Sequence, residues 1–325
     1  MAAVAAPALE WLPARRSLTF TFGEYCFHES WFEGLELLTH VTRITTPLDE
    51  TVAAVLPLLQ NHDAVILPSH PVTTAPQPLQ LTRRYMRYTL ATNNHYYIEV
   101  TDASFDDYLQ RLSRHHRHEI QRKLRRYLQA SGGTIEFRRY ATPQDARNFF
   151  ALARALSART YQDRLLGRGL PDTDAFRAEL DEHAARGTMR GYLLCHREQP
   201  IAFGYCAAIG DCLPFLFTGY DPAFAAWSPG IVLVYEMLRS IAGERQFAVL
   251  DFGSGEAQYK RMFATASRLC ATIFFFRPTP GHLITVLAHR GCIAASDGFA
   301  AAAARLGVKA WLKRLLRARA AARAL

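Results

Sequence analysis

A short segment in the second half of the chain has the residue types of an anion-binding helix start. Ser228, Pro229 and Gly230 precede an apolar stretch that begins with Ile231 and runs to about Ala242. Serine is favoured just before a helix and proline at its first position, so this order predicts a helix N-terminus. The unpaired backbone N–H groups at such an end can hold a pyrophosphate group, and glycine would allow close approach. The same residues would also make a plain helix cap.

Acidic side chains follow neighbouring predicted strands. Asp221, Asp251 and Glu256 are expected at strand or helix ends that face one crevice, where a carboxylate can accept a proton from an attacking group. Which of the three is the general base stays open, because the pKa of a carboxyl depends on its burial. Asp251 could instead only cap the helix that follows it.

A regular order of elements must position these residues. The expected elements are three antiparallel strands, a helix, a parallel strand, a short helix and a last strand, at residues 189–196, 201–209, 212–219, 229–242, 247–252, 256–264 and 269–276. The connection through the helix at 229–242 is long enough for a right-handed crossover between parallel strands. The sequence therefore predicts a mixed α/β core.

Further strands and helices are expected in the rest of the chain. In the first hundred residues we expect a strand at 17–25, a helix at 29–40 and a short strand at 64–67. One long helix is expected over residues 104–130, with Ser104 as its N-cap. Its polar face is strongly basic, with Arg111, Arg114, Arg117, Arg122, Lys123, Arg125 and Arg126. Thr142 and Pro143 are expected to open another helix.

Three segments carry a family resemblance. They are TYQDRLLGRGL (160–170), GYDPAFAAWSPG (219–230) and DFGSGEAQYKRMF (251–263). Together with the order of elements they resemble the CelD-type acetyltransferases of the GNAT class, which are related to the Fem-type aminoacyl transferases. The basic segment LSRHHRHEIQRKLRR is also similar, so the resemblance covers roughly residues 104–280. The chain has WSPG in place of the usual Q/R-x-x-G-x-G/A turn, which leaves the mode of cofactor binding open.

The resemblance implies an α/β (α+β) fold of the GNAT acyltransferase type, in tandem with a degenerate N-terminal GNAT-like half. The expected segments are the degenerate half (1–103), a basic linker helix (104–130), the C-terminal GNAT domain (131–280) and a helical tail rich in alanine and arginine (281–325).

The resemblance also implies a reaction, in which an acyl group passes from a thioester to an amine. The donor would be acyl-CoA or an acyl carrier protein, held by Phe217, Ser228, Pro229, Gly230 and Ile231. The strand around Phe217 would offer backbone groups that polarise the thioester carbonyl. The implied catalytic residues are Asp251, Lys260, Tyr220 and Glu256, with Lys260 holding phosphate or polarising the carbonyl and Tyr220 protonating the leaving thiolate. The acceptor would contact Tyr161, Arg164, Asp221 and Tyr259.

Composition narrows the class of protein. The 325 residues carry 38 basic and 29 acidic side chains, a formal charge of +9, which favours anionic partners. There is no apolar run of about 18 residues and no CxxC pair among the six cysteines, so we expect a cytoplasmic protein without a metal site. The tail places Trp311 and leucines among arginine and lysine, a pattern that would also suit peripheral contact with the inner membrane surface.

Two other functions stay open. The first is a Fem-type transferase that uses aminoacyl-tRNA as donor, since many phosphate contacts would suit the basic helix. The second is a non-catalytic accessory protein of exopolysaccharide or cellulose synthesis, because a fold does not fix a function.

Overall fold

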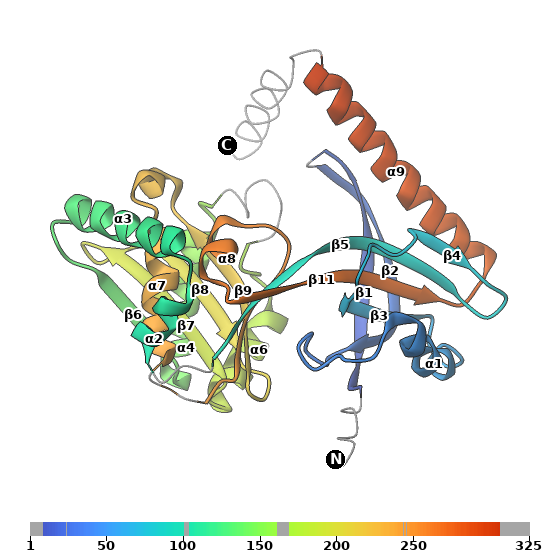
Figure 1. The fold of residues 1–325 in the computed structure, drawn as a ribbon, viewed down its shortest axis with the longest axis horizontal. Helices are drawn as coiled ribbons and strands as arrows, with labels where there is room; N and C mark the ends of the chain where they lie inside the picture. Colours follow the sequence, from blue (N-terminus) through green and yellow to red (C-terminus); the bar gives the residue numbers. More distant parts are fainter. Residues whose placement is uncertain are drawn as a thin grey trace. The chain divides into compact units, whose positions relative to one another are not determined.

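The computed structural model describes residues 9–23, 25–100, 104–160, 169–242, 244 and 246–305 (Figure 1). The chain divides into unit 1, residues 1–93 and 269–325, and unit 2, residues 94–268. Two strands, β5 (Met86–Glu99) and β11 (Ala266–Phe276), contribute residues to both units. Among the helices described, none has the length and apolar character needed to cross a membrane.

Unit 1 is a mixed sheet in the order β1-β2-β3-β11-β5, with β4 paired to β5. Its other elements are β1 (Trp11–Phe22), β2 (Tyr25–Leu37), α1 (Leu48–Leu58), β3 (Ala64–Pro71), β4 (Leu79–Leu81) and α9 (Pro280–Arg305). Ile66 of β3 lies in one core with Val286 of α9. Its neighbour Val65 lies in a second core with Val55 of α1. Because both faces of β3 are covered, this strand is a continuous apolar run rather than an alternating one.

Helix α9 is the described part of the helical tail that was expected at residues 281–325. It contacts β1 and is grouped with the N-terminal residues. The physical reason is the apolar side chain of Val286, which is fully buried in the unit 1 core. The second half of the expected tail, including Trp311, lies outside the described residues. A degenerate GNAT-like N-terminal half stays a prediction.

The expected helix at residues 29–40 is wrong. Residues 29–37 of this segment lie in β2, which pairs antiparallel with β1 along its whole length. Phe32 and Gly34 are buried, whereas Glu33 is exposed, so the side chains alternate with the period of a strand. The apolar residues also fitted a helical spacing, and the long ladder to β1 outweighs that local preference.

Gly34 is the residue of β2 where an added side chain should cost most. Gly34 is paired with Ala64 of the parallel strand β3, and a Cβ built on it would lie 1.9 Å from the Ala64 carbonyl oxygen. Since the obstacle is backbone, the two strands must part, and we expect Gly34→Ala to lower the free energy of unfolding by about 2–3 kcal/mol. The control is Gly291→Ala in α9, where a Cβ meets nothing within 4 Å. It should be neutral or stabilise by up to about 1 kcal/mol. Thermal unfolding of both variants checks this, and an equal effect would contradict it.

A buried histidine should make unit 1 sensitive to acid. His70 has no exposed surface; its Nδ1 lies 2.9 Å from the Pro71 carbonyl oxygen and its Nε2 lies 3.0 Å from Thr51 Oγ1. Burial lowers the pKa of His70 below its ordinary value of 6.5. The unfolded chain therefore binds a proton more readily than the folded one, and stability is lost as the pH falls below about 6.5.

The measurement is the melting temperature at pH 7.5 and at pH 5.5. We expect His70→Asn to reduce the loss between the two, with a remainder from His289, whose pKa burial also lowers. If His70→Asn and the unchanged protein lose the same number of degrees, the explanation is wrong.

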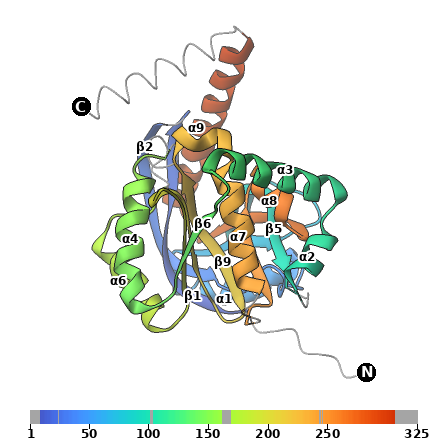
Figure 2. The ribbon, with the colours of Figure 1, turned by 90° about the vertical axis from the view of Figure 1, so that its left-hand side faces the viewer.

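Unit 2 is a sheet in the order β5-β10-β9-β8-β7-β6. Its other elements are α2 (Phe105–Arg111), α3 (Arg114–Ser131), β6 (Glu136–Tyr140), α4 (Pro143–Ser157), α6 (Asp174–Ala185), β7 (Met189–His196), β8 (Gln199–Ala207), β9 (Cys212–Tyr220), η1 (Pro222–Trp227), α7 (Pro229–Ala242), β10 (Val249–Ser254) and α8 (Gln258–Phe263). Helices α4 and α6 cover one face of the sheet, and α3 and α7 cover the other (Figure 2). This arrangement confirms the predicted mixed α/β class and the order of strands and helices from β7 onward.

The basic helix is two helices rather than one. α2 ends at Arg111 and α3 begins at Arg114, because Leu112 is extended and Ser113 caps the second helix by accepting a hydrogen bond from the His116 N–H. Ser104 is the N-cap of α2, as predicted. The turn between the helices was missed because the apolar rhythm continues across it.

Candidate functional site

The parallel strands β9 and β10 separate part of the way along. Val249–Asp251 of β10 pair with Cys212–Pro214 of β9. Both strands are fully described, and no other residues of β9 and β10 pair with each other. Pro214, the last paired residue of β9, has no N–H to continue the ladder. Beyond it, Phe215 and residues 217–220 of β9 pair with β8 and form no ladder with β10. The two strands therefore leave a gap in the ladder beyond Pro214.

A β-bulge lies at the start of this gap. Cys206 of β8 is opposite Phe215 and Tyr205 is opposite Phe217, so Leu216 is an extra residue in β9. The bulge turns Phe215 into the core beside α7, whereas Phe217 packs toward α6, 5.6 Å from the Phe176 ring. Bulges locally open the ladder and are common beside active sites. Phe217 was expected at the site from the sequence and Leu216 was not, because no residue type marks a bulge of this kind.

The helix α7 begins next to the gap, as predicted, but its cap is not the expected one. Ser228 has left-handed backbone angles (φ 57°, ψ 48°), because it ends the 3₁₀ helix η1. Its carbonyl accepts from the N–H groups of Ile231 and Val232 at 3.0 and 3.3 Å. Its hydroxyl accepts instead from the ammonium of Lys123 at 3.4 Å. Lys123 thus brings a positive charge from α3 to the positive end of α7, which the sequence analysis did not predict.

Tyr220 and Asp221, at the end of β9, lie in different surroundings. Tyr220 is 44 % exposed, and its ring lies beside Gly230, where a Cβ would be 3.6 Å from Tyr220 Cδ1. Asp221 is 8 % exposed; it caps η1 by accepting from the Ala223 N–H and forms an ion pair with Arg159 at 3.2 Å. The first residue can meet a ligand at the start of α7, whereas the second holds the chain after β9. Tyr161 and Arg164 lie outside the described residues.

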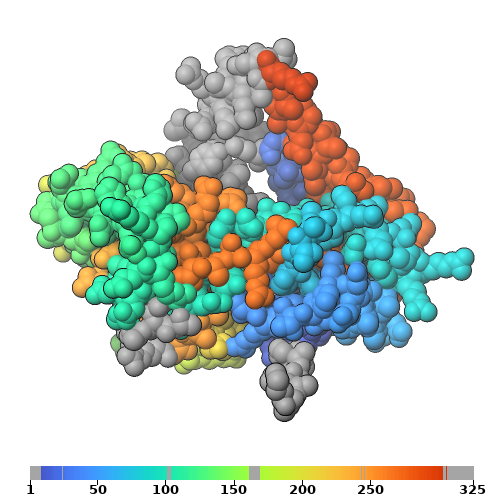
Figure 3. All heavy atoms as spheres, viewed as in Figure 1, coloured from blue at the N-terminus to red at the C-terminus, as the bar shows by residue number. Residues whose placement is uncertain are grey.

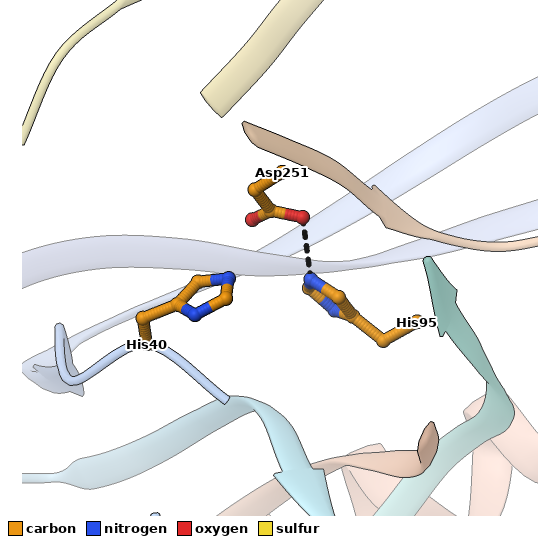
Figure 4. A group of neighbouring side chains, drawn as sticks. All are labelled: His40, His95 and Asp251. Atoms are coloured by element: carbon orange, nitrogen blue, oxygen red, sulfur yellow. Dashed lines mark hydrogen bonds and ion pairs between the residues drawn. The ribbon is translucent and has the colours of Figure 1, made fainter. Parts of the chain in front are cut away.

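Asp251 has a partner that the sequence analysis missed. Its Oδ1 lies 2.6 Å from Nε2 of His95 (Figure 4). The same oxygen also accepts from the Gly253 N–H at 2.6 Å. The Nδ1 atom of His95 lies 3.3 Å from Ser254 Oγ. His40, the third side chain labelled in Figure 4, belongs to unit 1. His95 lies on β5, 156 residues before Asp251, so only the pairing of β5 with β10 shows that they meet.

The other predicted residues of this part surround the turn after β10. Lys260 is 9 % exposed, and its ammonium donates to the carbonyl oxygens of Gly253 and Ser254 at 3.2 and 2.7 Å. Burial lowers the pKa of Lys260, against the attraction of Asp251 and Glu256. In this arrangement the lysine holds the turn that carries Ser254.

Glu256 and Tyr259 are the remaining two predicted site residues near this turn. Glu256 accepts a hydrogen bond from the Tyr96 hydroxyl at 2.7 Å, which lowers the pKa of Glu256 and makes it a weak base. Tyr259 packs between Phe215 and Phe252, with ring centroids 5.9 and 5.5 Å away, and burial raises the pKa of its hydroxyl. The predicted residues thus form two groups in unit 2, one at the start of α7 and one along β10 and α8.

Comparison with protein families gives a match to this part of the chain. Residues 114–261 match the family described as acetyltransferase (GNAT) domain. The match runs from α3 into α8 and contains the gap between β9 and β10 and the start of α7. It confirms the predicted GNAT-like fold and the prediction of a GNAT-type acyltransferase. No match was found among curated protein sequences.

Several solved structures are similar in fold at low sequence identity. FemX is 10 % identical, with 85 % of this chain and 90 % of that chain covered and a TM-score of 0.47. L-PGS from Bacillus licheniformis is 12 % identical, with 80 % and 85 % covered and a TM-score of 0.46. The C-terminal domain of a putative lysylphosphatidylglycerol synthetase from Agrobacterium fabrum is 6 % identical, with 80 % and 84 % covered and a TM-score of 0.47.

Proposed function

Since residues 114–261 match the acetyltransferase (GNAT) domain family, we propose that this protein transfers an acyl group from acyl-CoA to an amine. The observation that carries the proposal is the gap between β9 and β10 beside the start of α7. A thioester arm that lies along β9 can bond to its backbone as an added strand would, which positions the carbonyl at the bulge.

The start of α7 would hold the phosphates of the donor. The N–H groups of Ile231 and Val232 already donate to the Ser228 carbonyl, and Pro229 has no N–H, so the Gly230 N–H would meet the anion. The positive end of the helix and the ammonium of Lys123 add to this attraction. Gly230 adds no side chain there, and Tyr220 lies beside it with an exposed ring. Protonation of the leaving thiolate, the role expected for Tyr220, stays a prediction. CelD-like specificity, an acyl carrier protein as donor and a cytoplasmic location with peripheral membrane contact stay predictions.

A donor screen tests the proposal. The unchanged protein is mixed with acetyl-CoA, longer acyl-CoAs, acyl carrier protein or charged tRNA, and the melting temperature and the release of free thiol to amines are measured. We expect acyl-CoA to raise the melting temperature and to release thiol. If no thioester binds and none is consumed, the proposal is wrong.

A matched pair of variants locates the donor. Lys123→Gln removes the ammonium at the start of α7, where its side chain is 14 % exposed. Arg122→Gln removes a neighbouring charge that pairs with the same Glu119 but is 62 % exposed. We expect the first to weaken acyl-CoA binding by about three- to tenfold and the second to change it little. Equal losses would place the anion elsewhere.

A second candidate donor, aminoacyl-tRNA, is favoured by the exposed face of α3. Arg114, Arg122, Arg125 and Arg126 are exposed on this helix, which lies at the surface of unit 2 (Figure 3). Binding through many phosphates weakens steeply with salt, whereas acyl-CoA binding should be less sensitive. Absence of a tRNA gel shift at low salt would remove this candidate.

A further inference from the structure

The side chains of Asp251, His95 and Ser254 form a continuous hydrogen-bonded chain across two strands of unit 2. Ser254 and His95 are directly opposite in the antiparallel pair of β10 and β5. A register shift between Asp251 and Gly253 makes Phe252 an extra residue of β10. Without this bulge, Asp251 and Ser254, three residues apart on a strand, would point to opposite faces. The bulge therefore brings both of them to the same imidazole.

The hydrogen-bond distances suit one tautomer of His95. An ionised carboxylate only accepts, so Nε2 of His95 carries the hydrogen that Asp251 Oδ1 receives at 2.6 Å. Nδ1 of His95 lies 3.3 Å from Ser254 Oγ, and in the tautomer that carries its hydrogen on Nε2 this nitrogen can accept from the Ser254 hydroxyl. Asp251 is itself held by the Gly253 N–H at 2.6 Å. A carboxylate in this position stabilises the imidazolium that forms when Nδ1 takes a proton.

The exposed fractions of the three side chains show which end of this hydrogen-bonded series can meet a substrate. His95 is 6 % exposed and the side chain of Asp251 is 12 % exposed, whereas Ser254 is exposed. The hydroxyl is therefore the end that can meet a substrate. The other end is at the gap, because Asp251 is paired with Pro214, the last paired residue of β9.

We propose that Ser254, His95 and Asp251 form the proton relay that takes the proton from the acceptor amine; this inference rests on the proposed function. The amine nitrogen forms a bond to the thioester carbonyl carbon and gives its surplus proton to Ser254 Oγ. Ser254 passes its own hydroxyl proton to Nδ1 of His95. The carbon–sulfur bond then breaks with the electron pair on sulfur, and the thiolate takes up a proton as the imidazolium returns one to solvent. Ser254 is the catalytic residue, and His95 and Asp251 act through it.

This assignment gives Asp251 a different role from the one expected. A carboxylate bonded to both Nε2 of His95 and the Gly253 N–H orients the imidazole instead of meeting the amine. Lys260 contributes by holding the carbonyl oxygen of Ser254 at 2.7 Å, which fixes the turn that presents the hydroxyl. The relay thus uses residues of β5, β10 and α8.

The test compares Ser254→Ala, His95→Gln and Asp251→Asn with the control His183→Gln. His183 is on α6, where its Nδ1 bonds to Thr188 Oγ1. We expect the first two variants to lower kcat by about a hundredfold or more, with the donor KM within about threefold and the melting temperature little changed. Asp251→Asn should act in the same direction, and His183→Gln should match the unchanged protein. Because Ser254 is exposed, its variant reports on the relay even where His95→Gln does not fold.

Two further readouts separate the relay from other roles. In ¹⁵N spectra of histidine-labelled protein, His95 should be protonated at Nε2 and unprotonated at Nδ1, whether or not a donor is known. Intact mass after incubation with donor should show no acyl group on the protein.

Three outcomes overturn the relay: near-normal kcat in Ser254→Ala, a proton on Nδ1 of His95, or an acyl ester on Ser254. The last would make the serine a nucleophile. If the unchanged protein uses no thioester at all, the proposed function fails instead, and the spectra still decide whether His95 has the required tautomer.

Discussion

Gly230→Asp is expected to weaken the binding of an anionic donor by at least about tenfold while the protein stays folded. The new carboxylate would lie in the first turn of α7, which has no acidic residue, and like charges a few ångströms apart repel by more than the 1.4 kcal/mol that corresponds to tenfold. The fold should tolerate the change, because a Cβ on Gly230 makes only an ordinary contact of 3.6 Å with Tyr220. An acidic residue at a helix N-terminus even stabilises by about 0.3–1 kcal/mol.

The opposite signs of the two effects make this variant informative. Calorimetry should report weaker donor binding, while thermal unfolding reports an equal or higher melting temperature. Gly230→Asn, with nearly the same shape and no charge, is the control and should retain most of the affinity. If Gly230→Asp binds acyl-CoA as tightly as the unchanged protein, the phosphates do not lie at the start of α7.

Local signals of the sequence predicted much of unit 2. Thr142 caps α4 and Pro143 begins it, as expected, and the strand–helix–strand crossover from β9 to β10 is present with parallel register. These features depend on residues a few positions apart, such as a threonine and a proline at a helix start. Such short-range preferences can be recognised without knowing what the segment packs against.

The features that open the candidate site could not be predicted in the same way. Leu216 and Phe252 are ordinary strand residues, and each becomes the extra residue of a bulge only through its register with the neighbouring strand. His95 meets Asp251 because β5 pairs antiparallel with β10, a contact between residues far apart in the chain. The register between neighbouring strands depends on the complete sheet, so the residue pattern of a single strand does not predict it.

Residues 29–40 show that a local sequence pattern can also predict the wrong element. Their apolar spacing fitted a helix, but the hairpin with β1 buries Phe32 and places Gly34 against Ala64 of β3. Propensity is a weak guide where a long ladder competes with it. The correct signal was the glycine, which fits closely against a neighbouring strand and is unfavourable inside a helix.

Glu244→Ala is expected to be among the most destabilising changes in unit 2, at about 3 kcal/mol. Glu244 accepts from Nε and Nη2 of Arg190 at 3.0 and 2.9 Å and lies 2.7 Å from Nη2 of Arg139. Arg190 is only 6 % exposed, so removal of the carboxylate leaves a guanidinium buried without its counter-charge. Breaking a buried ion pair in this way typically costs about 3–5 kcal/mol. We expect a loss near the lower end, because Arg190 also donates to the backbone carbonyl oxygens of Gly187 and Met189 and keeps these bonds.

Hydrogen exchange of the β7 and β8 peptides measures this loss within unit 2. Glu182→Ala, which removes an exposed pair with Arg186, should cost at most about 1 kcal/mol and is the control. Arg190→Met combined with Glu244→Leu should recover most of the stability, because the penalty comes from the unpaired charge. A loss no larger than that of Glu182→Ala would contradict the argument. Since Glu244 follows α7 and ties the chain to β6 and β7, the same variant should also loosen the connection that places the start of α7 beside the gap between β9 and β10.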